Sequence, residues 1–110
     1  MVSKVIITRK AQKQLAAFVG YIIRAFQNKQ AAKLLIEDSK LTKKRLLDVA
    51  ESLPLCKDSE LAALGYKTIH FKSHRYLFVF EIRGSTAFVE AVYHELQDYE
   101  NIFKSEVQNS

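Results

Sequence analysis

The hydrophobic period of the chain changes once, and this change constrains the fold more than any other feature. Before residue 54, apolar residues recur three and four positions apart, as on one face of an α-helix. After residue 65 they alternate with polar residues, as in half-buried strands. A chain of 110 residues supports one hydrophobic core, so we expect one domain over residues 1–110, with its helices first and its sheet second.

The first half predicts a strand followed by two helices. The β-branched run at residues 4–8 is typical of a short strand with both faces largely covered. Apolar spacing predicts a helix over residues 11–27, then a second helix that Asn28 caps and Pro54 ends. Two long helices joined by about two residues must run antiparallel, as a helical hairpin.

The second half predicts an antiparallel meander. Strands are expected over residues 66–71, 75–83 and 86–94, with Gly84-Ser85 as a two-residue turn between the last two. Asp98 is expected to cap a short terminal helix. The resulting order, β-α-α-β-β-β-α, indicates an α+β fold in which an antiparallel helical hairpin packs on a small, mainly antiparallel sheet.

Charge and composition narrow the class of protein. Residues 1–56 carry eleven Lys and Arg against four Asp and Glu, while residues 57–110 carry six against eight. A basic half of this kind suits nucleic acid or an acidic protein partner. No apolar run approaches the roughly 20 residues of a membrane span, and Cys56, expected to be a buried inert thiol, requires no oxidising compartment. We expect a cytoplasmic protein with no membrane partner, and no cofactor or metal, because neither a Cys/His cluster nor a phosphate-binding glycine loop is present.

Five passages, in this order and at compatible spacing, resemble the RelE/ParE superfamily of type II toxin–antitoxin toxins. They are Tyr21-Ile22-Ile23, Ala31-Ala32, Gly65-Tyr66-Lys67-Thr68-Ile69, His74-Arg75-Tyr76-Leu77-Phe78-Val79-Phe80 and Tyr93-His94-Glu95-Leu96-Gln97-Asp98-Tyr99. The resemblance covers nearly the whole chain. It implies the RelE/ParE-like fold, a growth-inhibiting toxin, and a cognate antitoxin protein as partner.

The superfamily contains two kinds of toxin, and fold does not distinguish them. RelE-like members cut messenger RNA in the ribosomal A site without a metal, whereas ParE-like members poison DNA gyrase without cleaving RNA. Our leading expectation is a RelE-like, ribosome-dependent mRNA endoribonuclease whose partner is mRNA on the ribosome, and the alternative is a ParE-like gyrase poison. A third alternative is a member that has lost toxicity and is kept as a partner or repressor subunit.

Four residues are candidates for catalysis under the nuclease hypothesis. RNA cleavage without a metal needs a base, an acid and cations that stabilise the phosphorane. By resemblance, His70 and His94 correspond to the titratable strand residues, Arg75 to the phosphate-binding arginine, and Tyr99 to a tyrosine that stacks on a base or donates a proton. The two histidines could divide acid and base roles across neighbouring strands. An exposed histidine, a surface arginine and a packing tyrosine are the alternative interpretations.

Three further residues are candidates for binding the substrate: Lys72, Tyr93 and Arg83. The alternative interpretations are a solvated turn lysine for Lys72 and an aromatic core residue for Tyr93. Three features favour the ParE-like alternative, and one of them is the long helical hairpin with Tyr21-Ile22-Ile23 and Ala31-Ala32. Leu77 stands where many RelE-like enzymes have an arginine, and Glu95, Asp98 and Glu100 bring negative charge close to the proposed centre.

Overall fold

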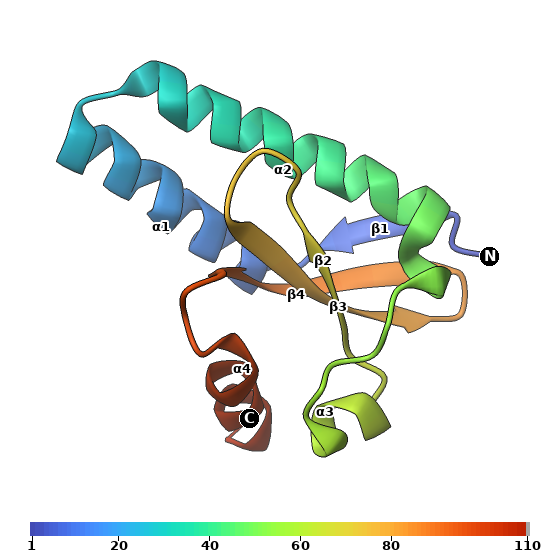
Figure 1. The fold of residues 1–110 in the computed structure, drawn as a ribbon. Coiled ribbons are helices and arrows are strands. Elements are labelled where there is room, and N and C mark those ends of the chain that lie inside the picture. Colours follow the sequence, from blue (N-terminus) through green and yellow to red (C-terminus); the bar gives the residue numbers. More distant parts are fainter. Residues whose placement is uncertain (110) are drawn as a thin grey trace.

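The computed structural model describes residues 1–109 and confirms the expected α+β order (Figure 1). Its elements are β1 (Lys4–Ile7), α1 (Arg9–Phe26), α2 (Lys29–Val49), the 3-10 turn η1 (Ala50–Ser52), α3 (Ser59–Ala63), β2 (Lys67–His70), β3 (Tyr76–Arg83), β4 (Thr86–His94) and α4 (Tyr99–Gln108). The short helix α3 is an addition to the predicted order, and the second helix stops before Leu53. No helix within residues 1–109 is long and apolar enough to cross a membrane.

The helical hairpin is set by side-chain caps at its two starting points. Thr8 accepts a hydrogen bond from the Ala11 N–H at the start of α1. Asn28, as predicted, accepts one from the Ala31 N–H at 2.9 Å at the start of α2. Between the helices Gln27 adopts a left-handed conformation with φ of 48°, which ends α1 and turns the chain back. Figure 1 shows α1 and α2 running antiparallel, which confirms the predicted hairpin.

The sheet has the strand order β1-β4-β3-β2. β1 pairs with β4 in parallel, while β2, β3 and β4 form the predicted antiparallel meander. The first strand was expected to be covered on both faces, but Lys4 is exposed and residues 5–7 are only half-buried. The reason is position, because β1 is an edge strand, and sequence alone does not indicate where a strand lies in the sheet.

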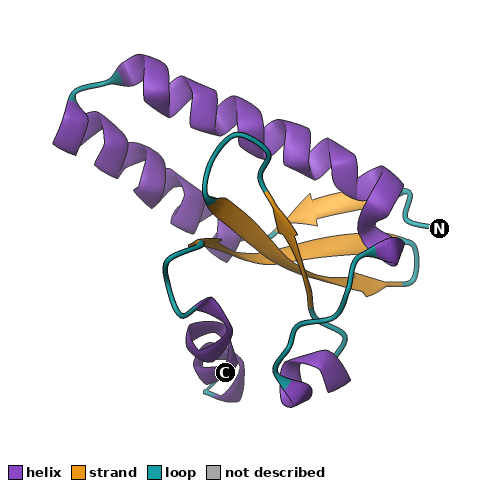
Figure 2. Cartoon of the chain, in the orientation of Figure 1, coloured by secondary structure: helices purple, strands orange, loops and turns teal. Residues whose placement is uncertain are grey.

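Helices cover both faces of the sheet (Figure 2). On one face the hairpin encloses the larger core, which includes Leu35, Leu46, Phe78, Phe80 and Val92. On the other face α3 and α4 enclose a smaller core, which includes Cys56, Leu61, Leu77, Tyr93 and Phe103. A side chain of β3 or β4 therefore faces either the hairpin or the helices α3 and α4. Two side chains on opposite faces cannot contact the same ligand.

A β-bulge in β4 changes which face its later residues occupy. Phe80 pairs with Val89 but Val79 pairs with Ala91, so Glu90 is an extra residue between them. One inserted residue reverses the faces of all residues that follow it in the strand. Val89 and Val92 consequently both belong to the core beneath the hairpin, and His94 pairs with Tyr76.

The two short helices differ in how they begin. Asp58 caps α3, since its Oδ1 accepts hydrogen bonds from the N–H groups of Glu60 and Leu61, both at 3.0 Å. Asp98 occupies the N-cap position of α4, as predicted, but its side chain makes no capping hydrogen bond. Its carboxylate instead accepts a hydrogen bond from the Asn101 side chain at 2.8 Å.

Candidate functional site

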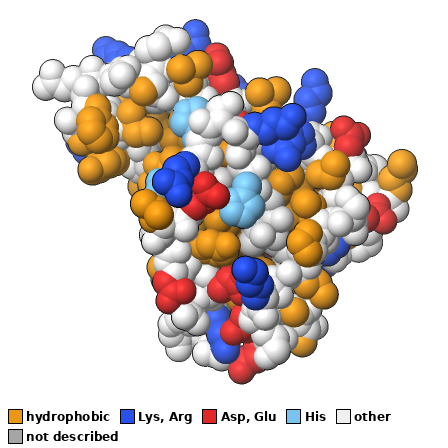
Figure 3. Space-filling view, viewed as in Figure 1, with side chains coloured by type: hydrophobic (Ala, Val, Ile, Leu, Met, Phe, Trp, Pro, Cys, Tyr) orange, Lys and Arg blue, Asp and Glu red, His pale blue; other side chains and the backbone are white. Residues whose placement is uncertain are grey.

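Glu95 joins two of the predicted site residues at one end of the sheet. Its Oε2 lies 2.8 Å from His70 Nδ1, and its Oε1 lies 3.7 Å from Arg75 Nε. All three side chains are reachable from solvent, and Arg75 is 69% exposed. Figure 3 shows histidine, basic and acidic side chains side by side in the middle of this face. The carboxylate orients the imidazole and balances the positive charge of the guanidinium.

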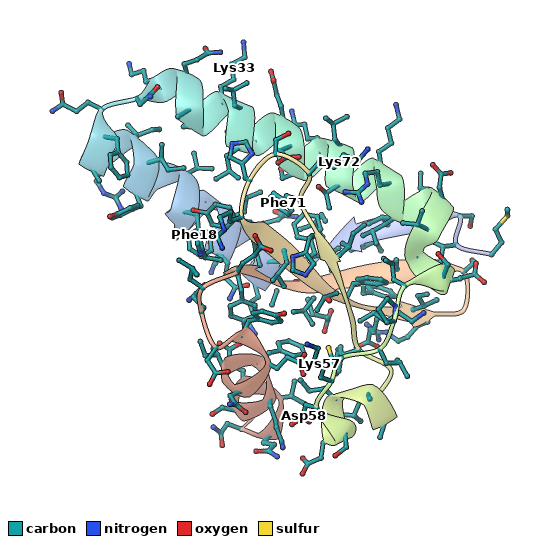
Figure 4. All side chains as sticks on the ribbon, viewed as in Figure 1. Phe18, Lys33, Lys57, Asp58, Phe71 and Lys72 are labelled. Atoms are coloured by element: carbon teal, nitrogen blue, oxygen red, sulfur yellow. The ribbon has the colours of Figure 1, made fainter. Side chains whose placement is uncertain are left out.

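A cavity of about 590 Å³ lies next to His70. Its lining combines the end of α2, the connection to α3, strand β2 and the start of α4: Arg45, Leu53, Pro54, Leu55, Cys56, Lys57, Thr68, Ile69, His70, Tyr99 and Glu100. Lys57 lies between α3 and α4 in Figure 4. Burial raises the pKa of Tyr99. His70, Tyr99 and two cations thus share this cavity.

Arg45 fixes the strand that carries His70. Its Nη1 donates a hydrogen bond to the His70 carbonyl oxygen at 3.1 Å, which ties α2 to the end of β2. Thr68 and His70 share one face of β2, and Ile69 and Phe71 are buried on the other, as the alternation predicted. The guanidinium adds positive charge at the rim of the cavity without meeting Glu95.

His94 lies on the opposite face of the sheet from His70. β3 separates the two strands, so the expectation of neighbouring strands is wrong. His94 pairs with Tyr76, whose ring centroid is 5.0 Å from the imidazole, whereas His70 pairs with Leu77 on the other face. His94 Nδ1 accepts a hydrogen bond from the Leu96 N–H at 3.0 Å. The ring therefore serves the turn after β4 and does not face the cavity.

The bulge at Glu90 accounts for this separation. Counted from the Gly84-Ser85 turn without an inserted residue, His94 would lie opposite Arg75 and share its face with His70. The nuclease hypothesis, in which both histidines act on one phosphate, requires such a shared face. The structure instead places His70 and Tyr99 in one cavity and connects His70 to Arg75 through Glu95, while His94 lies on the other face of the sheet.

The predicted substrate-binding residues do not gather at the cavity. Tyr93 is 3% exposed and packs in the core beneath α3 and α4. Lys72 is exposed in the β2–β3 loop near α2 (Figure 4). Arg83 lies at the far end of β3, roughly 20 Å along the strand from Tyr76, where it covers Phe88 and pairs with Glu81.

Two functional side chains were missed by sequence reasoning. Glu95 was counted only as unfavourable charge, and it reaches His70 because the bulge at Glu90 turns His94 to the hairpin face and Glu95 to the face of His70. Arg45 was hidden among the basic residues of α2, and no local signal distinguishes it. Residues 1–109 hold no group of three or more His, Cys, Asp or Glu side chains placed to bind a metal ion.

Comparisons with known proteins agree with this fold. A family profile described as "ParE toxin of type II toxin-antitoxin system, parDE" matches residues 5–99. The chain therefore belongs to the ParE toxin family of type II toxin–antitoxin systems. A solved structure described as a chromosomal ParDE TA system from P. aeruginosa superposes with a TM-score of 0.70 at 17% identity, covering 84% of this chain and 96% of that one. No curated protein sequence matches the chain significantly.

Proposed function

We propose that this toxin acts in the cytoplasm by binding DNA gyrase, and that a cognate antitoxin holds it inactive. Membership of the ParE family supports a toxin with an antitoxin partner. The observation that carries the choice of target is the separation of His70 from His94 on opposite faces of the sheet. This replaces mRNA cleavage, our leading expectation from sequence, by the ParE-like alternative.

The physical argument concerns the geometry of proton transfer. Cleavage of RNA needs a base and an acid within hydrogen-bond reach of one phosphate. Here the two histidines cannot meet one phosphate, because the sheet lies between them. Glu95 also places a carboxylate between His70 and Arg75, where a phosphate would have to bind. Binding of a protein target needs neither arrangement.

One observation favours RNA cleavage as the second candidate. The cavity of about 590 Å³ next to His70 holds Tyr99, Arg45 and Lys57 in its lining. In that case His70 would be the base, Tyr99 the acid, and Arg45 with Lys57 the phosphate-binding cations. This set contains neither His94 nor Arg75, so substitutions of those two residues distinguish it from the catalytic set expected from the sequence.

Two assays distinguish the candidates, one with purified toxin and one in cells that express it. If the toxin poisons gyrase, adding purified toxin to gyrase should linearise plasmid DNA, and messenger RNA in induced cells should keep its normal ends. The single variants His70→Ala and His94→Ala should both arrest growth as the wild type does. New mRNA ends that disappear in His70→Ala, with no gyrase-dependent DNA breaks, would replace the proposal by the nuclease.

A further inference from the structure

The five lysines of α2 lie on one side of the helix. At about 3.6 residues per turn, they fall within an arc of roughly 100° around the helix axis. All five are exposed, and they are Lys29, Lys33, Lys40, Lys43 and Lys44. Within residues 1–109 none of their side chains forms an ion pair or a hydrogen bond. We call these residues the lysine stripe, and its charges are available to a partner.

The stripe follows an outer border of the molecule. α2 runs along this border in Figure 1, and Lys33 points away from the sheet in Figure 4. From Lys29 to Lys44 the helix rises about 22 Å, at about 1.5 Å per residue. The acidic residues of α2 lie outside the arc of the stripe. The potential in front of the stripe is therefore positive along its whole length.

The remaining positions within the arc offer little to a protein partner. They are Ile36 and Leu47, which are 36% and 40% exposed. About 16 Å of helix separates these two residues, so they do not form one apolar patch. The affinity of a protein partner depends on a cluster of desolvated apolar contacts, which the stripe lacks. Binding to phosphates requires only the cations.

A duplex fits the stripe better than a single strand does. Proteins that bind single strands stack the bases on aromatic rings, and α2 contains no Phe, Tyr, Trp or His. A duplex carries about one charge per 1.7 Å of its axis, so a length of about 22 Å presents about 13 phosphates. Lysine binds phosphate as a point charge and fixes no base identity. The stripe is therefore suited to the backbone of a duplex of any sequence.

We propose that the lysine stripe of α2 binds duplex DNA along its phosphate backbone, without sequence preference. The inference rests on the proposed function and deepens it, because gyrase acts on duplex DNA. A toxin bound to gyrase contacts the enzyme and its DNA together, and the second contact adds to the affinity of the first. The toxin consequently binds the complex of gyrase with DNA more tightly than it binds gyrase alone.

Fluorescence anisotropy with a short labelled duplex tests the DNA contact on the full chain. Two pairs of lysines at the same spacing are replaced, one toward each end of the stripe: Lys29→Gln/Lys33→Gln and Lys40→Gln/Lys44→Gln. Each pair should lower affinity roughly tenfold at about 50 mM salt, and should reduce the slope of log K against log salt by about two, since about one counterion is released per phosphate contact. The control Arg9→Gln/Lys13→Gln removes two exposed cations from α1 at the same spacing, and should lower affinity less than about twofold.

Plasmid linearisation by gyrase tests what the contact contributes to the toxin. The variant with both lysine pairs replaced should need at least about threefold more toxin than wild type for half-maximal linearisation. The control Arg9→Gln/Lys13→Gln should need the same amount as wild type. An unchanged requirement in the lysine variant would overturn the contribution of the stripe to gyrase poisoning.

The other outcomes separate this inference from the proposed function. A wild-type chain that linearises plasmid with gyrase but does not bind the duplex would overturn the inference and leave the proposed function intact. Duplex binding without linearisation would do the reverse. A loss confined to one lysine pair, or equal to the loss in the control, would show that the duplex does not lie along α2. Equal affinity for single-stranded RNA, or lysine variants that weaken only antitoxin binding, would assign the stripe to those partners.

Discussion

His74 Nδ1 lies 2.7 Å from Asp38 Oδ2, and this contact joins the helical hairpin to the β2–β3 loop. Asp38 is only 4% exposed, in the middle of α2. The same oxygen accepts a hydrogen bond from the Ser73 N–H at 3.0 Å. A buried carboxylate is tolerated when such partners replace its hydration. Asp38 therefore fixes the loop that ends at Arg75.

Asp38→Ala should lower the free energy of unfolding by about 2 kcal/mol, because it leaves the Ser73 N–H and the His74 ring without their acceptor. Urea unfolding of the variant and wild type measures this difference. Glu37→Ala, on the same helix turn but exposed, is the matched control and should change stability by less than about 0.5 kcal/mol. Equal losses in the two variants would mean that the contact with the loop contributes nothing specific.

Glu95→Gln should strengthen binding of single-stranded RNA to the isolated protein. The substitution removes the negative charge between His70 and Arg75 and frees both for phosphate. For partly exposed groups we expect a gain of roughly two- to fivefold, which fluorescence anisotropy at low salt would detect. Glu37→Gln removes the same charge from α2, where the side chain is exposed and contacts neither His70 nor Arg75, and should leave affinity within about twofold. A variant of Glu95 with wild-type affinity would show that this carboxylate does not repel RNA.

The elements of the fold were predictable from the sequence because their signals are local. The hairpin depends on apolar spacing and on Asn28, and β3 and β4 follow from alternation around a short turn. The place of β1 was not predictable, because its pairing with β4 joins residues more than 80 positions apart. Helix α3 was missed because a helix of five residues shows too little periodicity to be recognised.

The candidate site was predicted only in part, and one residue explains most of the difference. Residue types suitable for phosphate chemistry were visible in the sequence, but their faces depend on the register of β4. No local pattern marks Glu90 as an inserted residue, yet it sends His94 to the hairpin side. His70 was placed correctly because its strand contains no bulge.

Asp58 should make the protein sensitive to acid. Hydrogen bonds from the Leu61 N–H and from Lys104 hold the pKa of this carboxyl below its ordinary value of 3.8. Because the pKa of Asp58 is lower in the folded state than in the unfolded state, its ionised carboxylate stabilises the fold fully at pH values above the ordinary pKa. This stabilisation is lost as the pH falls through the lowered, folded-state pKa. Asp58→Asn should therefore lose stability at about pH 7 and approach wild type at about pH 2.

Urea unfolding across this pH range measures the gap between Asp58→Asn and wild type. Asp98→Asn is the control, since Asp98 also precedes a helix but makes no capping hydrogen bond. Its unfolding profile should follow that of wild type. A gap for Asp58→Asn that stays constant down to about pH 2 would mean that the charge on Asp58 does not contribute to the cap.

Cys56 should react slowly with thiol reagents as long as α3 and α4 stay closed over it. Burial, followed by the charges of Glu100 and Asp58, raises the pKa of this thiol to about 11. Disulfide-exchange labelling at about pH 8 should then be at least about 100-fold slower in the folded protein than in urea. Labelling at similar rates in both conditions would show that the thiol is accessible in the native state.

Glu100→Gln should accelerate this labelling of Cys56 for two reasons. The carboxylate accepts hydrogen bonds from the N–H groups of Lys57 and Asp58, at 3.2 and 2.7 Å, and so holds α4 against the start of α3. Its loss weakens the closure over the thiol and removes a charge that opposes thiolate formation. Glu106→Gln removes the same charge from α4 itself, where the carboxylate pairs with Lys10 of α1 and not with α3, so we expect a smaller effect. An equal acceleration in both variants would mean that general charge, and not the contact of Glu100 with α3, controls access to the smaller core.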